Sequence, residues 1–121
     1  MALQGPLIPI VLIPRFTSYF NVSGSRDFPS VALDVSAYVG GDIVLWCGPL
    51  LGTSSPTIAV TVQDSEDALN WSTIGTGGAS STSGVISLTL TRRWLRVLVT
   101  ITGTNAAITC WCAGSLERRV A

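Results

Sequence analysis

Hydrophobic and polar positions alternate along much of this chain, and the alternation is clearest in residues 55–71. Between residues 58 and 62 every second side chain is aliphatic, and alanine and threonine lie between them. This two-residue period is typical of a β-strand with one buried face and one face in water. Residues 64–70 then supply turn-forming polar side chains, and Trp71 opens a short second strand over 71–74. The stretch predicts a central strand followed by a hairpin return.

The same period recurs elsewhere, and turn-forming residues separate the segments that carry it. The further predicted strands cover residues 15–20, 31–36, 43–50, 86–91, 95–101 and 107–116. Gly103-Thr104-Asn105 is expected to join the last two as a tight hairpin. No window shows the 3.6-residue period over the length that a globular helix needs. We therefore predict an all-β fold, an antiparallel β-sandwich or jelly roll of about eight strands.

The first 14 residues are strongly apolar but contain Pro6, Pro9 and Pro14. Their apolar run is shorter than the roughly 20 residues that span a bilayer, and proline favours an extended backbone. The segment is expected to be an edge strand packed on its own domain or an extended arm on a partner. We divide the chain into an N-terminal arm at 1–14, a sandwich domain at 15–116 and a C-terminal tail at 117–121. The candidate partner-binding residues of the arm are Leu7, Ile8, Ile10, Val11, Leu12 and Ile13.

Charged side chains are scarce. Seven arginines balance seven acidic residues, lysine and histidine are absent, and charged residues make up 12% of the chain, about half the usual fraction. Nucleic acid and anionic membranes are bound through clustered Lys and Arg, so neither is expected as a partner. A surface so poor in charge is expected to contact other protein, and a homo-oligomer, either a dimer or a trimer, is predicted.

The three cysteines, Cys47, Cys110 and Cys112, are an odd set. Cys110 and Cys112 share one face of a predicted strand, so a disulfide between them would distort the backbone. At least one thiol is therefore expected to be free, which favours synthesis in a reducing cytoplasm. Three cysteines without histidine make a poor zinc site, and buried structural cysteines are the expectation.

Catalytic chemistry has little support in this sequence. Without histidine the commonest general base is missing, and no Ser-His-Asp or Cys-His set can form. Asp64, Glu66 and Asp67 lie in a predicted turn, which does not imply the carboxylate separation of a glycosidase or the spacing of a calcium loop. We expect no enzyme, no metal and no cofactor.

Four tryptophans lie on or beside predicted strands. Such side chains usually fill sandwich cores or subunit interfaces, although several on one exposed face could stack sugar rings. The candidate interface residues are Trp46, Trp94, Arg96 and Trp111.

One combination of motifs resembles a known class of protein. A strand led by Pro56-Thr57 ends in a Ser65-x-Asp67 turn, Trp71 follows, and a later strand carries the step Trp94-Leu95-Arg96-Val97. Over about residues 53–104 this pattern is similar to small virion proteins of tailed bacteriophages.

The resemblance implies a structural protein on the capsid surface of the virion. It implies a capsid decoration or cement protein that binds the major capsid protein as an oligomer and stabilises the assembled head. Two alternatives stay open. One is a tail or head–tail joining component, and the other is a carbohydrate-binding sandwich that uses exposed tryptophans.

Overall fold

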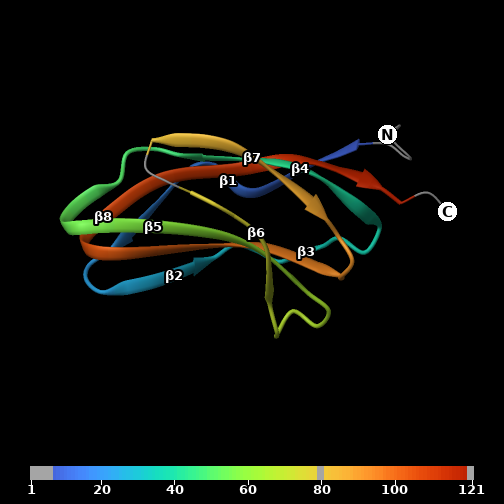
Figure 1. The fold of residues 1–121 in the computed structure, drawn as a ribbon, viewed down its shortest axis with the longest axis horizontal. Helices are drawn as coiled ribbons and strands as arrows, with labels where there is room; N and C mark the ends of the chain where they lie inside the picture. The colour runs from blue at the N-terminus through green and yellow to red at the C-terminus, as the bar shows by residue number, and fades with distance from the viewer. Residues whose placement is uncertain (1–6, 79–80, 120–121) are drawn as a thin grey trace.

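The computed structural model describes residues 7–78 and 81–119, and these form a two-layered β-sandwich (Figure 1). The strands are β1 (Leu7–Asn21), β2 (Ser25–Pro29), β3 (Leu33–Asp34), β4 (Tyr38–Cys47), β5 (Leu51–Ser65), β6 (Ser72–Gly77), β7 (Thr82–Thr89) and β8 (Trp94–Arg118). Every paired strand runs antiparallel to its neighbour. The described residues contain no helix, and so none that is long and apolar enough to cross a membrane. The predicted all-β sandwich class is confirmed.

The long strand β8 belongs to both layers. Its first part, near residues 94–102, lies between β5 on one side and β2 and β3 on the other, with β6 beyond β5. Its second part, near residues 106–118, lies between β1 and β4, with β7 beyond β4. Figure 1 shows β8 turning from one layer into the other at one end of the molecule, and the start of β1 and the end of β8 lie at the opposite end.

This crossing corrects the predicted hairpin at residues 103–105. The two parts of β8 pair with different strands in different layers, because Gly103 and Asn105 turn the chain with φ angles of 141° and 49°. The predicted hairpin of the central strand is confirmed, since β5 and β6 pair directly from Val60↔Gly77 to Asp64↔Ser72.

The structure also corrects the expectation of a separate arm for residues 7–14. These residues form the first half of β1, which pairs with β8 from Leu7↔Glu117 onward. Leu12 and Ile13 are buried in the core, so the edge-strand alternative applies to this stretch. The prolines are tolerated because β1 pairs on one side only, and residues 1–6 lie outside the described part. At the other end β8 runs to Arg118, which places buried Glu117 within the sheet and not in a tail.

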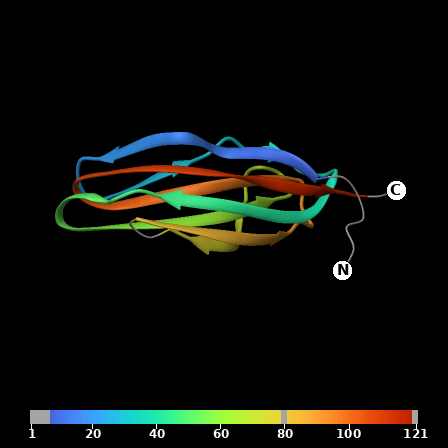
Figure 2. The ribbon, with the colours of Figure 1, turned by 90° about the horizontal axis from the view of Figure 1, so that it is seen from above.

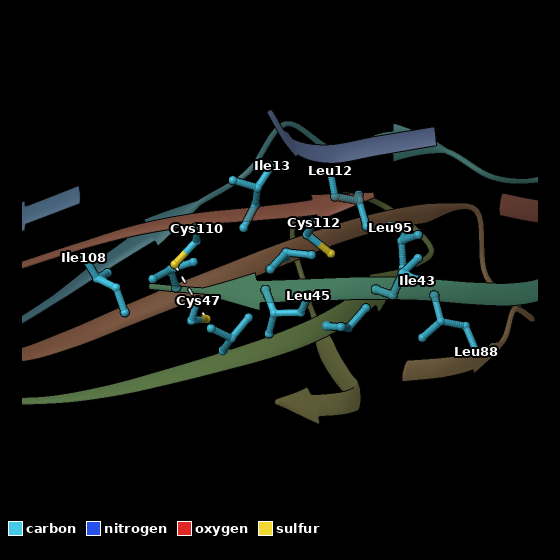
Figure 3. Close-up of a cluster of buried hydrophobic side chains, with 14 of the residues drawn as sticks. Leu12, Ile13, Ile43, Leu45, Cys47, Leu88, Leu95, Ile108, Cys110 and Cys112 are labelled. Atoms are coloured by element: carbon cyan, nitrogen blue, oxygen red, sulfur yellow. Dashed lines mark hydrogen bonds between the residues drawn. The ribbon is translucent and has the colours of Figure 1, made fainter. Parts of the chain in front are cut away.

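The core lies between the two layers (Figure 3). Before the crossing, the odd-numbered residues of β8 from Leu95 to Ile101 face inward. After the crossing, even-numbered residues such as Ile108 and Leu116 do so, because the chain enters the second layer with its faces exchanged. Cys47 and Cys110 lie opposite each other in register within this core, with their Sγ atoms 3.7 Å apart.

Candidate interaction surface

The layer built from β1, β8, β4 and β7 carries apolar side chains on its outer face. Figure 2 shows these four strands side by side. Val85, Val44, Ala113 and Val11 are cross-strand partners in one row, which runs from β7 through β4 and β8 to β1. Val85 and Val11 at the ends of this row are 64% and 57% exposed. We call this set the valine row.

An aromatic row lies beside the valine row. Trp46 on β4 and Trp111 on β8 are direct cross-strand partners, and both are half-buried. The Arg15 guanidinium lies 5.0 Å from the Trp111 ring centre, and the Phe16 ring packs perpendicular to Trp46 with centroids 6.0 Å apart. The apolar face is defined here as Val11, Phe16, Val44, Trp46, Val85, Trp111 and Ala113.

Phe16 reaches this face through an irregularity in β1. The pairing of β1 with β8 shifts register between Ile13 and Thr17, and Phe16 adopts a left-handed φ of 62°. A bulky residue rarely adopts this conformation, which costs about 1–2 kcal/mol. The Thr17 hydroxyl donates a 2.7 Å hydrogen bond to the Pro14 carbonyl and holds the bulge. The bulge thus keeps an aromatic side chain that is 64% exposed against the aromatic row.

The edges of the apolar face carry charges of opposite sign. Asp42 precedes Val44 of the valine row along β4 and accepts a 2.8 Å hydrogen bond from the Ser87 hydroxyl. Arg15 lies at the other end, over Trp111. A shallow groove of about 510 Å³ lies at the Asp42 end, between Val44 and Leu7. The surface is therefore uneven and uncharged at its centre, and its charged groups lie at the two ends, where Glu117 also lines the groove beside Asp42.

The outer face of the other layer is different in character. Its outward positions on β5 and β8 are mostly polar, and those that are threonine are Thr57, Thr61, Thr100 and Thr102. Arg96 lies with its guanidinium carbon 4.1 Å from the Trp71 ring centre and donates a 2.8 Å hydrogen bond from Nε to Gln63 Oε1. Burial lowers the pKa of Arg96, and nearby Asp27 acts in the opposite direction.

The structure divides the four predicted interface residues between two surfaces. Trp46 and Trp111 lie together on the apolar face, as cross-strand neighbours. Trp94 and Arg96 lie on the polar outer face of the other layer, where Arg93 stacks on Trp94 at 5.2 Å. A single interface that includes all four side chains would have to surround the sandwich.

Phe16 and Val85 are members of the apolar face that sequence reasoning did not single out. Phe16 was placed on a strand whose outward side could not be assigned, because the bulge breaks the two-residue period. Val85 follows a glycine- and serine-rich stretch that predicted a loop, whereas β7 begins at Thr82. The aliphatic side chain of Val85, directly before the alternating run from Ile86, is the one indication in the sequence that the strand begins earlier.

Asp67 in the β5–β6 turn is engaged in local contacts. Asp67 accepts hydrogen bonds from the backbone N–H groups of Leu69 and Asn70, both at 2.9 Å, and from the Ser65 hydroxyl at 3.0 Å. These bonds, led by those from Asn70 and Leu69, lower the pKa of Asp67. Within the described residues no group of three or more Cys, Asp or Glu side chains is placed to hold a metal ion.

The cysteines are buried in the sandwich core. A hydrogen bond with Cys47, followed by burial, raises the pKa of Cys110 far above its usual range. Burial raises the pKa of Cys112 to about 12. Neutral, inaccessible thiols are poor nucleophiles and poor metal ligands, so these residues act as small core side chains.

Comparisons with known proteins show a shared fold at low sequence identity. The sequence matches no protein-family model and no curated protein sequence. The PBSX exported protein XepA superposes with a TM-score of 0.61 at 11% identity, covering 94% of this chain and 38% of that chain. A structure of infectious bursal disease virus superposes with a TM-score of 0.50 at 8% identity, covering 92% of this chain and 31% of that one. The chain therefore corresponds to about a third of each neighbour, and the likeness is one of fold, with a viral protein among the neighbours.

Proposed function

We propose that this chain is a non-enzymatic structural protein of a virus particle of the tailed-phage type. In this role it binds the major capsid protein on the assembled head as a decoration or cement protein. The observation that carries the proposal is the apolar face, an exposed outer sheet surface with aromatic side chains and no charge at its centre. Contiguous exposed apolar surface of this kind marks sites of protein association.

Three further features support an adhesive role. The charged fraction of the whole chain is 12%, which suits extensive contact with protein. Asp67 is engaged in a turn, and the three cysteines are buried in the core. The two-layered sandwich also resembles a domain in a viral structure. A protein that binds only the assembled shell stabilises it by mass action, without any turnover.

The proposal is tested by binding to shells of the virus that encodes the chain. Shells assembled without the protein are mixed with purified protein and sedimented, and the heat stability of the shells is followed by light scattering. We expect saturable co-sedimentation and a higher disruption temperature. Absence of the protein from purified particles, together with no binding to shells, would refute the proposal.

The alternatives make different predictions in related experiments. A tail or joining component uses the same kind of contact, and gold-labelled antibodies on whole particles would place it at the tail or the neck. A carbohydrate-binding module requires open aromatic ring faces, whereas Arg15 stacks on Trp111 and Phe16 packs on Trp46. Unchanged tryptophan emission across a panel of glycans is therefore the expected result.

A further inference from the structure

We infer that the apolar face pairs two copies of this chain, sheet against sheet, about a twofold axis that lies in the interface. The inference concerns the same surface as the proposed function and names the partner that covers it first. It rests on the register, exposure and charge of that surface, and it holds for the isolated protein whether or not a shell is present.

The apolar face has enough area for an interface between two copies. Neighbouring strands lie about 4.8 Å apart and residues rise about 3.3 Å along a strand. Four strands and the stretch from Asp42 to Cys47 therefore outline roughly 20 Å by 20 Å in projection. Side-chain relief raises the accessible area above the projected one, so two copies bury on the order of 1,000 Å² in total. This area meets the lower limit of about 1,000 Å² for a biological interface, so a second copy can cover the face.

The shape of the apolar face allows two copies to fit together. The valine row contains small side chains, and the aromatic row beside it contains the large ones. A twofold axis that crosses the strands between the two rows places the aromatic row of one copy over the valine row of the other, and repeats the contact in reverse. Face-to-face sheets pack about 10 Å apart with strands inclined by about 30°, which is the geometry that such rows fill. Twofold dimers require this kind of self-complementary surface.

The charged groups at the ends of the apolar face are compatible with pairing of two copies. Arg15 and Asp42 lie at opposite ends of the apolar face and have opposite sign. The twofold pairing places the Arg15 end of one copy over the Asp42 end of the other, so groups of opposite charge face each other, whereas like charges would oppose the pairing. Ser87 and Trp111 already engage the two groups. Neither charge therefore has to be buried without a partner in the dimer.

The strained bulge at Phe16 fits this interpretation. A positive φ at a bulky residue costs folding energy and is found where the surrounding structure has a use for it. Here it projects a ring that is 64% exposed beside Trp46. Large aromatic side chains near the centre of an interface commonly supply much of its binding energy. Phe16 is therefore the expected anchor of the dimer.

The test measures the mass of the purified full chain by analytical ultracentrifugation over a wide range of concentrations. We expect a concentration-dependent shift from the 12.7 kDa monomer to twice that mass. Val85→Glu and Val11→Glu, combined on the apolar face, should weaken dimerisation by about tenfold or more. Ala59→Glu with Thr73→Glu, on exposed positions of the other layer, is the matched control and should leave the dimer unchanged.

A second variant keeps the test decisive if the charged variants do not fold. Phe16→Gly removes the anchor ring and relieves the positive φ, so the monomer should be at least as stable to urea while the dimer weakens. A wild-type chain that stays monomeric at every concentration would overturn the inference. So would a dimer that is lost only in the control variant and retained in both face variants.

The same variants separate this inference from the proposed function. If the wild-type chain is a monomer and Val85→Glu with Val11→Glu abolishes shell binding, the apolar face meets the shell, so the inference fails and the function stands. If the chain dimerises through the face but never binds shells, the function fails and the inference stands.

Discussion

Replacement of Gly114 by alanine should destabilise the sandwich strongly, because β4 passes unusually close to β8 at this point. Gly114 pairs with Ile43 across the two strands. A Cβ atom at position 114 would lie 2.6 Å from the Ile43 Cα and closer still to the Asp42 carbonyl oxygen. Both contacts are with backbone, so no side-chain rotation relieves them.

The size of the effect follows from two opposing terms. Alanine in a strand is favoured over glycine by about 0.5–1 kcal/mol when space allows. Overpacking that forces backbone movement costs about 1–3 kcal/mol, and here it also strains the hydrogen bonds between β4 and β8. We therefore expect Gly114→Ala to lower the free energy of unfolding by about 2 kcal/mol. With a slope of about 2 kcal/mol per molar urea, the midpoint should fall by about 1 M.

The measurement is urea unfolding followed by tryptophan fluorescence, with two other glycines as controls. Gly84→Ala on β7 introduces a Cβ with no atom within 4 Å, so it should raise the free energy of unfolding by about 0.5–1 kcal/mol. Gly24→Ala also enters open space but has a φ of 71°, which isolates the conformational cost of about 1 kcal/mol. If Gly114→Ala and Gly84→Ala unfold at the same urea concentration, the close approach of β4 and β8 is not a real constraint.

Three further predictions concern ionisable groups. Burial raises the pKa of Cys112 to about 12. Above pH ~9 the unfolded chain therefore releases a proton that the folded chain keeps. The contribution of Cys112 to the free energy of unfolding should be fully present below that pH and should fall as pH rises, by up to ~1.4 kcal/mol per pH unit. Urea midpoints between pH 8 and 11 measure this, and Cys112→Ala should reduce the slope but not remove it, because the pKa of Cys110 is also raised. Hydrogen bonds from backbone N–H groups lower the pKa of Asp67. Its contribution is therefore present above pH ~4 and lost as pH falls, and in thermal melts Asp67→Ala should lower the midpoint at pH 7 but less at low pH. Arg92→Met leaves buried Asp64 without the Arg92 guanidinium 3.7 Å away. The free energy of urea unfolding should fall by about 1–2 kcal/mol, a modest loss because Arg92 is itself partly exposed. Asp64→Asn added to Arg92→Met should recover part of this loss.

The sequence predicts the strands of this fold well where one face is buried and the other is wet. In β5 and in the first part of β8, the aliphatic residues that alternate in the sequence are the ones that line the core. The period also predicts that no helix forms. These features depend on local chemistry, because a strand with one buried face needs an apolar side chain at every second position.

The pairing of strands depends on information that the local pattern does not contain. Residues 95–101 and 107–116 are separated by a short turn, so a hairpin was the simplest expectation. The structure places them in different layers, because β5 and β1 supply partners from distant parts of the chain. The choice of partner decides which tryptophans share a surface. This explains why Trp46 and Trp111 meet while Trp94 lies elsewhere.

The N-terminal segment shows a second limit. Its aliphatic residues run consecutively, so the two-residue period gives no orientation for the side chains. The register shifts near Val11 and Ile13 then bury two successive residues, Leu12 and Ile13, and bring Phe16 to the outer face. A bulge adds a residue to one strand without a marker that can be recognised in the sequence. The exposed anchor of the candidate site could therefore not be predicted.

The two outer faces of the sandwich explain why likeness of fold leaves the function open. The core side chains that define the fold point inward, and many combinations of aliphatic residues fill the same space. The outward positions are free to differ, and in this chain they are threonine-rich on one layer and valine and tryptophan on the other. Neighbours at 8–11% identity show the same fold, and a shared fold does not fix a function. The proposed function therefore rests on the apolar face itself, whose in-register rows are the surface for which we propose a protein partner.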